Sequence, residues 1–452
     1  MHAGIVGLGQ WQGDEYDYAA SLREQGLGFA LHRVATHSPR PLSEFFICLY
    51  MEIVNSTGRP LIGPVLGLGW TIFLLGCNLP LIICYAGRLL PRLFVGLCLT
   101  TLFLIGHPAA DLFYWPFAAI AYLPTVAALT VVTIQILDDR NQTSRGRLIS
   151  MLSLLVAGAS SEIGSMVVLA FVSSILATAT LRRGEKVGIA WLIPPLLLSV
   201  GVLSMTILHR GAEPPTILSL TSHNMINSIR SAFIQALRVI LEVDPNDADW
   251  GQENSGYLAY GVPIKLVVFV GFVLSARRCF GRAPLIPTLA LILSLFIGIT
   301  GSTLSAYYQF GFLCCQRHET LRQCLIVLTI LGVATMLGSR QRLIRVGAVS
   351  EVASVTCLTV AIMVMAVWRI PNLVYAYHHS AESDADLKRT WDSGFGSGSA
   401  IIMSEPDGPL VHSWSFPTGE HKASPTNSFD VGSIMRFFRK RDLLVLPSSQ
   451  SP

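Results

Sequence analysis

Two uncharged stretches of the sequence decide the fold class, namely LIGPVLGLGWTIFLLGCNLPLIICYAG at residues 61–87 and LFYWPFAAIAYLPTVAALTVVTIQIL at residues 112–137. A helix that crosses a membrane needs about 20 largely apolar residues, because its backbone groups must bond to one another inside the hydrocarbon. Both stretches exceed that length without one Asp, Glu, Lys or Arg. They therefore predict membrane-spanning helices.

The composition of the whole chain agrees with these stretches. Of its 452 residues, 52% are hydrophobic and 13% are charged, whereas an average soluble domain is about 25% charged. This argues against a soluble globular enzyme and against a disordered protein. The net charge of +4 implies no nucleic-acid partner. The nine cysteines lie mostly in apolar runs without regular spacing, which predicts small buried side chains rather than a disulfide or zinc framework.

Further apolar stretches bring the predicted number of spans to ten, so the predicted fold class is all-α, a polytopic transmembrane helix bundle. Residues 148–181 are too long for one span and break at 158–164, where small residues surround Glu162. We expect two short helices there that meet near one membrane face. The other predicted spans are residues 89–106, 187–208, 257–276, 284–301, 322–338 and 346–368.

Clusters of arginines lie in every second predicted loop, whereas the intervening short loops hold only Arg317. Loops rich in Lys and Arg stay in the cytoplasm, so this bias places both termini outside in a multi-pass membrane protein. The loop at 209–256 has three basic residues, but long loops count little in this rule. An even number of spans returns the chain to its starting side, so the span count and the charge bias agree. The basic loops contain Arg88/Arg92, Arg140/Arg145/Arg147, Arg182/Arg183/Lys186, Arg277/Arg278/Arg282 and Arg340/Arg342/Arg345.

Three polar segments are predicted to be extracytoplasmic. They are an N-terminal segment at 1–60, a loop at 209–256 within the transmembrane bundle 61–368, and a small C-terminal tail at 369–452. The loop contains an amphipathic stretch, which predicts a helix lying on the membrane surface or on the bundle. Its recurring apolar residues are Ile226, Ile229, Phe233, Leu237 and Ile240.

Unusual polar residues gather on this predicted outer face. The sequence GDEYDY at residues 13–18 brings Asp14, Glu15 and Asp17 together with two tyrosines. Three acids in an external loop are most often solvated surface, but an ionisable residue such as Glu162 between two apolar spans usually faces a cavity or a partner. The remaining candidates are Arg33, His37, Arg40, His107, Asp111, Tyr114, Trp115, Arg230, Arg317 and His318.

Together these groups suit one kind of chemistry. Neighbouring carboxylates can act as a general base that deprotonates a hydroxyl, and arginines can hold a phosphate bidentately and offset its charge. The rings beside Asp111 can stack on a sugar or line a lipid groove, although an interfacial aromatic belt also accounts for the rings alone. The set predicts transfer of a sugar from a lipid-phosphate donor.

The same residues resemble motifs of the class C membrane glycosyltransferases. Asp14-Glu15-Tyr16 looks like their acidic signature, which lies in the first external loop and contains the catalytic base. The chain is more similar still to an uncharacterised bacterial family of multi-pass proteins with that architecture. The further motifs of that family are matched, in order, by Ser38-Pro39-Arg40-Pro41, Asp111-Leu112-Phe113-Tyr114-Trp115, Ser161-Glu162-Ile163-Gly164 and Arg317.

The resemblance implies a polyprenyl-phosphate-linked sugar as donor, a cell-envelope glycan or glycolipid as acceptor, and contact with membrane lipid. Asp14 would be the catalytic base, with Glu15 as its partner or as a metal ligand, and Arg40 and Arg317 would bind the donor phosphate. Some class C enzymes use a divalent metal ion and others do not, so the need for a cofactor stays open. The other implied substrate-binding residues are Asp111, Tyr114, Trp115, Glu162 and His318.

Two other classes of function stay open. A transporter or flippase of lipid-linked saccharides would carry polar residues at mid-membrane and show internal repeats, and neither is evident in this sequence. A non-catalytic membrane scaffold would have its external acids and arginines paired only with one another.

Overall fold

The computed structural model describes most of the chain, which folds into two compact units. The first unit combines residues 1–71, 109–123 and 368–452, and the second combines residues 72–108 and 124–367. His107 and most of the loop 209–256 lie outside the described residues. The described residues are 9, 11–83, 89–105, 111–181, 189–210, 225–241, 258–280, 283–310, 316–339, 348–404, 418–424 and 427–447.

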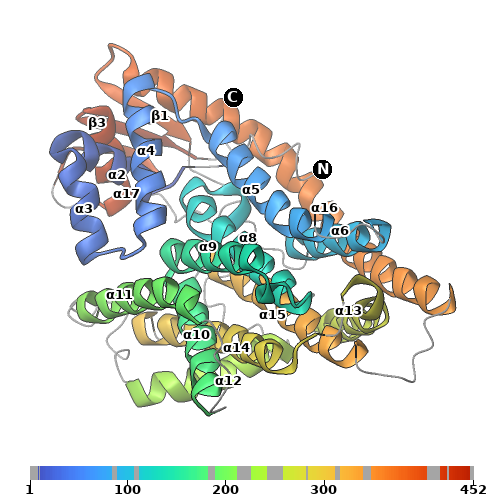
Figure 1. The fold of residues 1–452 in the computed structure, drawn as a ribbon. Coiled ribbons are helices and arrows are strands. Elements are labelled where there is room, and N and C mark those ends of the chain that lie inside the picture. The colour runs from blue at the N-terminus through green and yellow to red at the C-terminus, as the bar shows by residue number, and fades with distance from the viewer. Residues whose placement is uncertain are drawn as a thin grey trace. The chain divides into compact units, whose positions relative to one another are not determined.

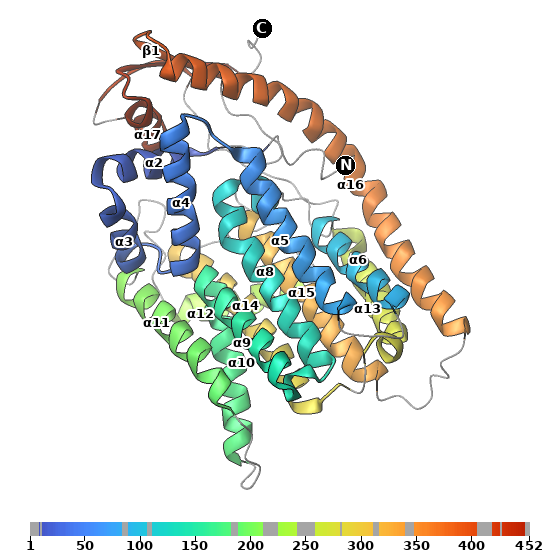
Figure 2. The same cartoon turned by 45° about the horizontal axis from the view of Figure 1, so that its top comes forward.

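The first unit joins the N-terminal helices to the C-terminal part of the chain, and these lie side by side in both ribbon views (Figures 1 and 2). The connections between its N-terminal helices are short, and Gly26 adopts a positive φ of 63° between the first two. Its helices are α2 (Gly13–Gln25), α3 (Leu27–Thr36), α4 (Pro41–Thr57), the start of α5 (Ile62–Ile82), α7 (Asp111–Tyr114), the start of α8 (Pro116–Leu137), the end of α16 (Ala348–Phe395) and α17 (Phe429–Phe438).

A small sheet of three strands departs from the predicted all-helical fold. Its order is β1-β3-β2, with β1 (Ala400–Ser404) parallel and β2 (Gly419–Lys422) antiparallel to the central strand β3 (Asp442–Leu446). Alternate residues of β1 and β3 are buried, as expected for a sheet with one covered face. The segment that we expected to form a C-terminal tail therefore contains packed secondary structure.

An aromatic cluster joins the two ends of the sequence in this unit. Trp11 and Trp391 meet edge to face with ring centroids 5.2 Å apart, and Tyr16 lies 5.5 Å from Phe437. Phe437 in turn contacts Phe438 at 4.8 Å. Such pairs contribute about 0.5–1.5 kcal/mol each beyond the area that they bury. Residues near both termini therefore share one core.

The second unit is a bundle of helices, and Figure 2 shows many of them running roughly alongside one another. The most extensive helix pairs are α10 with α14 and α13 with α15. Gly298 lets α14 approach α10, because a side chain there would overlap Val167. Its helices are the rest of α5 and α8, α6 (Leu89–Ile105), η2 (Arg140–Gln142), α9 (Ser144–Ser160), α10 (Glu162–Leu181), η3 (Ala190–Leu192), α11 (Ile193–Arg210), α12 (Met225–Leu241), α13 (Leu258–Cys279), α14 (Leu285–Phe310), α15 (Gln316–Gly338) and the start of α16.

Among the residues that the structure describes, six helices are long and apolar enough to cross a membrane, which indicates a membrane protein. The predicted break near Glu162 is confirmed, since α9 ends at Ser160 and α10 begins at Glu162. Three further predicted spans are apolar helices of 10–17 residues within 89–105, 261–276 and 351–367. The count of ten spans stays a prediction. The six helices cover Ile62–Ile82, Pro116–Leu137, Glu162–Thr180, Ala190–Leu208, Leu285–Tyr308 and His318–Gly338.

Two of the arginine-bearing connections meet at one carboxylate in the second unit. Arg92, at the start of α6, binds both oxygens of Asp138 at 2.7 and 3.1 Å, and Arg140 donates to the same carboxylate at 2.9 Å. Asp138 follows α8, so the start of α6 and the end of α8 lie together. This agrees with the prediction that both connections lie on the same membrane side, while the identity of that side stays a prediction.

The predicted amphipathic helix is present as α12, and it packs on α14. Its small residues Ala232 and Ala236 are buried, whereas Ile226 and Phe233 are 80% and 50% exposed. Thr303 of α14 donates a hydrogen bond to the carbonyl of Ala232 at 3.0 Å. A large apolar face therefore points away from the bundle, as in a helix that rests on a lipid surface.

Candidate functional site

The acidic motif forms the first turns of α2, and the structure separates its two candidate catalytic residues. Asp14 is exposed, whereas Glu15 is fully buried. The Glu15 carboxylate accepts a hydrogen bond from the backbone amide of Gln12 at 2.9 Å and so closes the first turn of the helix. Glu15 therefore has a clear structural role, and Asp14 is the carboxylate that solvent can reach.

Burial raises the pKa of Glu15 well above its ordinary value. The Gln12 amide lowers that pKa in part, the charge of Asp14 raises it, and the indole of Trp115 lowers it. Burial also raises the pKa of Tyr50 well above its ordinary value, to which the charge of Glu15 contributes. The environment of Glu15 favours a neutral carboxyl, which is a poor metal ligand.

Two further carboxyls lie within electrostatic reach of Asp14. Burial raises the pKa of Asp430 at the start of α17, and the charge of Asp14 raises it further. Burial likewise raises the pKa of Asp17, although Arg436 and Arg33 partly lower it. We refer to Asp14, Asp17 and Asp430 as the acidic trio. Within the described residues, no group of three or more His, Cys, Asp or Glu side chains is arranged to hold a metal ion.

The absence of a side chain at Gly13 lets Asp430 of α17 lie close to α2. A Cβ atom at Gly13 would overlap the carboxyl of Asp430, so any other residue would force that side chain to move. The glycine of the motif is thus explained by packing rather than by backbone conformation. It is a feature that the sequence alone did not single out.

Arginines on the same two helices neutralise part of this charge. The guanidinium of Arg436 lies 3.3 Å from the Asp17 carboxylate and 3.5 Å from that of Glu24. It also donates to the hydroxyl of Ser21. Arg23 donates to the carbonyl of Phe437 at 2.6 Å. Much of the acidic motif therefore holds α2 against α17.

Two further arginines of the N-terminal segment have local partners. Arg33 pairs with the buried Glu44 at 3.3 Å and lies 5.0 Å from the ring centre of Tyr18, a cation–π contact. Arg40 precedes α4 and donates to the hydroxyl of Ser38 at 2.8 Å. Arg40 is half-exposed, so solvent can reach this candidate for a phosphate.

The aromatic motif after residue 110 belongs to the core of the first unit. Tyr114 is fully buried and Trp115 nearly so, and Trp70 donates to the carbonyl of Phe113 at 2.9 Å. The side chain of Asp111 lies outside the described residues, although its backbone begins α7. The burial of these rings is explained by packing. They are neither exposed to a membrane interface nor open to stack on a sugar.

The motif around Glu162 is a helix start in the second unit. Ser161 accepts a hydrogen bond from the amide of Gly164 at 3.0 Å and lies 3.0 Å from the hydroxyl of Thr125. A side chain at Gly164 would overlap the carbonyl of Ala157. Half-buried Glu162 occupies the first turn, where a carboxylate offsets the positive end of the helix dipole. The small residues of this motif are explained by this tight corner.

The last predicted pair lies in the first turn of α15. His318 is half-buried, and the side chain of Arg317 lies outside the described residues. The sequence analysis missed Arg322 one turn later, which is almost fully buried and donates to Glu319 at 2.9 Å. Its i, i+3 spacing from Glu319 was the available signal. That the residues of both units share one site stays a prediction.

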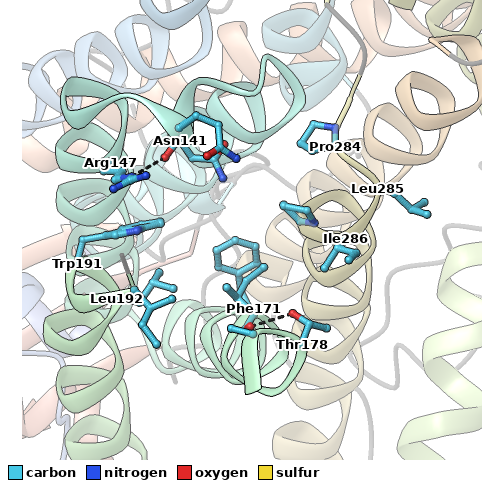
Figure 3. A pocket seen from close by; sticks show the side chains of 14 residues that line it. Asn141, Arg147, Phe171, Thr178, Trp191, Leu192, Pro284, Leu285 and Ile286 are labelled. Atoms are coloured by element: carbon cyan, nitrogen blue, oxygen red, sulfur yellow. Dashed lines mark hydrogen bonds between the residues drawn. The ribbon is translucent and has the colours of Figure 1, made fainter. Parts of the chain in front are cut away.

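The second unit also contains a cavity of about 340 Å³ that no motif indicated. Its wall combines Asn141, Gln142 and Arg147 with apolar side chains of α10, η3 and α14 (Figure 3). Within the described part of the chain, none of the predicted site residues lines it. The cavity is therefore considered separately below.

Comparison with protein-family models, curated proteins and solved structures finds no match for this chain.

Proposed function

We propose that the chain is a membrane glycosyltransferase that transfers a sugar from a polyprenyl-phosphate-linked donor to a cell-envelope glycan or lipid on the extracytoplasmic face of a bacterial plasma membrane. The observation that carries this proposal is the exposure of Asp14 at the N-terminus of α2, beside Asp17 and Asp430. Six helices suited to crossing a membrane agree with a lipid-linked donor.

In this proposal Asp14 removes the proton of an acceptor hydroxyl as the hydroxyl oxygen attacks the anomeric carbon. The bond between that carbon and the phosphate oxygen breaks, and the polyprenyl phosphate leaves with the electron pair. A positioned base of this kind contributes about 100- to 10,000-fold to a rate. Glu15 acts as a positioning residue, because its bond to Gln12 fixes the turn that carries Asp14.

The remaining assignments belong to the same proposal. In the first unit, half-exposed Arg40 binds the donor phosphate and Asp111 orients the sugar or the acceptor. Tyr114 and Trp115 act from the core by supporting the segment around Asp111, since both rings are buried.

A second candidate, a non-catalytic envelope scaffold, is favoured by one specific observation. Arg436 pairs with Asp17, and Arg33 pairs with Glu44, so several acids and arginines of the first unit bind each other. Such pairs account for the conspicuous charges without a substrate. The enzyme proposal requires the Asp14 carboxylate as a base, whereas the scaffold proposal does not.

The deciding experiment is a lipid-linked glycan profile of a strain that lacks this gene, complemented with wild-type or variant protein. The enzyme proposal expects the polyprenyl-linked donor to accumulate in the deletion strain and in a strain carrying Asp14→Asn at wild-type protein level. Normal profiles in both strains would exclude the enzyme and favour the scaffold.

A further inference from the structure

The cavity of the second unit has a polar wall and an apolar wall, and the two are contributed by different helices (Figure 3). Asn141 and Arg147 come from the connection into α9 and from its first turn. Phe171 and Ile175 of α10 and Ile286 of α14 form much of the apolar wall, with the half-buried ring of Trp191 beside Arg147. The cavity is therefore built for a ligand with one polar end and one apolar end.

The polar wall has unused hydrogen-bonding capacity. Arg147 donates from Nε to the backbone carbonyl of Asn141 at 3.0 Å, and within the described part of the chain its two terminal nitrogens have no hydrogen-bond partner. The side-chain oxygen of Asn141 is buried and, among the same residues, has no partner either. A buried acceptor without a partner is costly, so a ligand that donates a hydrogen bond there would remove that cost.

The charges around the polar wall favour an anion. Within the described residues Arg147 forms no ion pair: Asp138 is bound by Arg92 and Arg140, and the Asp139 side chain bonds to Gln142. Phosphate groups suit a guanidinium because its parallel N–H donors match two phosphate oxygens. The ligand should therefore carry a phosphate and, beside it, a hydrogen-bond donor.

The position of the cavity identifies where such a ligand comes from. Its lining is drawn from three connections that precede or follow apolar helices, at residues 141–147, 189–192 and 284–287. All three adjoin basic loops that the charge bias places at the cytoplasmic face. Phosphates of the inner leaflet occupy this depth, and their acyl chains extend toward the bilayer centre.

We propose that the cavity binds one anionic phospholipid with a hydroxylated head group, of the phosphatidylglycerol class. Its phosphate binds Arg147, a head-group hydroxyl donates to Asn141, and the first part of an acyl chain packs on Phe171 and Ile175. A volume of about 340 Å³ accommodates this portion of the lipid, while the rest of the chain lies in the membrane. This site does not depend on the proposed sugar transfer.

The test uses Trp191 as a built-in reporter, because a bromine atom on a nearby acyl chain quenches tryptophan fluorescence. The full-length protein is placed in nanodiscs with brominated phosphatidylglycerol or brominated phosphatidylcholine, and the signal of Trp191→Phe is subtracted. We expect half-maximal quenching at about tenfold less phosphatidylglycerol than phosphatidylcholine, the effect of one charge-assisted contact. Equal quenching by the two lipids would refute the proposal.

Two variants separate the polar contact from general lipid binding. Arg147→Gln should abolish the preference for phosphatidylglycerol and leave quenching by phosphatidylcholine unchanged. Arg145→Gln is the matched control, since Arg145 is exposed in the same turn and does not line the cavity. A preference retained in Arg147→Gln, or lost in Arg145→Gln, would overturn the assignment to Arg147.

A third variant keeps the proposal testable if Arg147→Gln fails to fold. Ala179→Phe fills the cavity from its apolar wall, so it should remove the phosphatidylglycerol preference in a protein that retains Arg147. An unchanged preference would contradict binding in the cavity. Millimolar inorganic phosphate should not restore Trp191 fluorescence. If it did so in the wild type and not in Arg147→Gln, the site would belong to a soluble phosphate compound instead.

Discussion

Asp17 and Arg436 form an ion pair across 419 residues of sequence, with a guanidinium nitrogen 3.3 Å from the carboxylate and 3.1 Å from the carbonyl oxygen of Asp17. The same guanidinium also binds Glu24 and Ser21. The N-terminal acidic motif is therefore part of an interface with the C-terminal helix α17. Any functional account of the motif has to separate this role from catalysis.

A variant of Asp14 can separate catalysis from the interface with α17, because Asp14 is the exposed member of the motif. We expect Asp14→Asn to reduce sugar transfer by at least about 100-fold, since the amide cannot accept the proton of the acceptor. Glu24→Gln is the matched control, because Glu24 is exposed on the same helix. Transfer is measured by glycan profiling at equal protein level. Wild-type glycan with Asp14→Asn would remove Asp14 from the mechanism.

The Asp17–Arg436 pair should contribute modestly to stability. Arg436 is 40% exposed, so solvent screens the pair, and we expect Arg436→Ala to lower the free energy of unfolding by about 1 kcal/mol. A double-mutant cycle with Asp17→Asn measures the coupling between the two side chains. A coupling energy of zero would show that the pair adds nothing beyond the contacts of Arg436 with other groups.

The aromatic cluster should contribute more to the free energy of unfolding than the Asp17–Arg436 pair does. Phe437→Ala removes a buried ring that contacts Trp11, Tyr16 and Trp391, and we expect a loss of about 3–5 kcal/mol. Phe429→Ala on the same helix is the control, since Phe429 is 56% exposed and should cost less than about 1 kcal/mol. Stability is measured by thermal unfolding. If Phe437→Ala and Phe429→Ala lost the same amount of stability, the result would contradict a core shared by the two chain ends.

Burial of Glu15 makes the stability of the first unit depend on pH. Its folded-state pKa lies above the unfolded value, so the folded state holds its proton more tightly and stability falls as pH rises through the folded pKa. Asp17 and Asp430 contribute with the same sign. We expect Glu15→Gln, which stays neutral, to weaken this dependence and to be more stable than wild type at alkaline pH.

The check is chemical unfolding between about pH 5 and pH 9. A wild-type stability that rises with pH over this range, or a Glu15→Gln variant with an unchanged slope, would contradict the predicted protonation of Glu15. Glu52→Gln serves as the control, because Glu52 is exposed on α4. Its slope should equal that of the wild type.

Membrane sidedness can be tested at two exposed positions. Ser144 is exposed and follows an arginine-bearing connection. The cysteine of Ser144→Cys should therefore react with an impermeant thiol reagent only after the membrane is opened. Arg230→Cys lies on α12, in the segment predicted to be external, and should react in intact spheroplasts. The opposite pattern would invert the proposed topology and place the acidic trio in the cytoplasm.

Local patterns of the sequence predicted much of the bundle. Long uncharged stretches predicted α5 and α8, and the small residues around Glu162 predicted the corner between α9 and α10. The spacing of Ile226, Ile229 and Phe233 predicted the amphipathic helix α12. These elements depend on neighbours within a few turns, which is information that a single sequence carries.

The first unit was not predictable in the same way. Its core joins Trp11 and Tyr16 to Trp391 and Phe437, and no periodicity relates residues so far apart. The helix α16 also continues to Phe395 although its apolar stretch ends near Trp368, because the residues that follow are mostly compatible with a helix. The roles of Glu15 in closing a turn and of Gly13 in admitting Asp430 emerge only from three-dimensional contacts.

The packing of α17 against α2 limits how this protein can be engineered. Reporter fusions that replace the chain beyond residue 395 would remove Phe437 and Phe438, which contact Trp11 and Tyr16, so the truncated product would lack part of the core. Tags meant to follow the intact molecule belong after Leu446, where β3 ends. Affinity handles at the very start face a similar difficulty, because Trp11 is already part of the core.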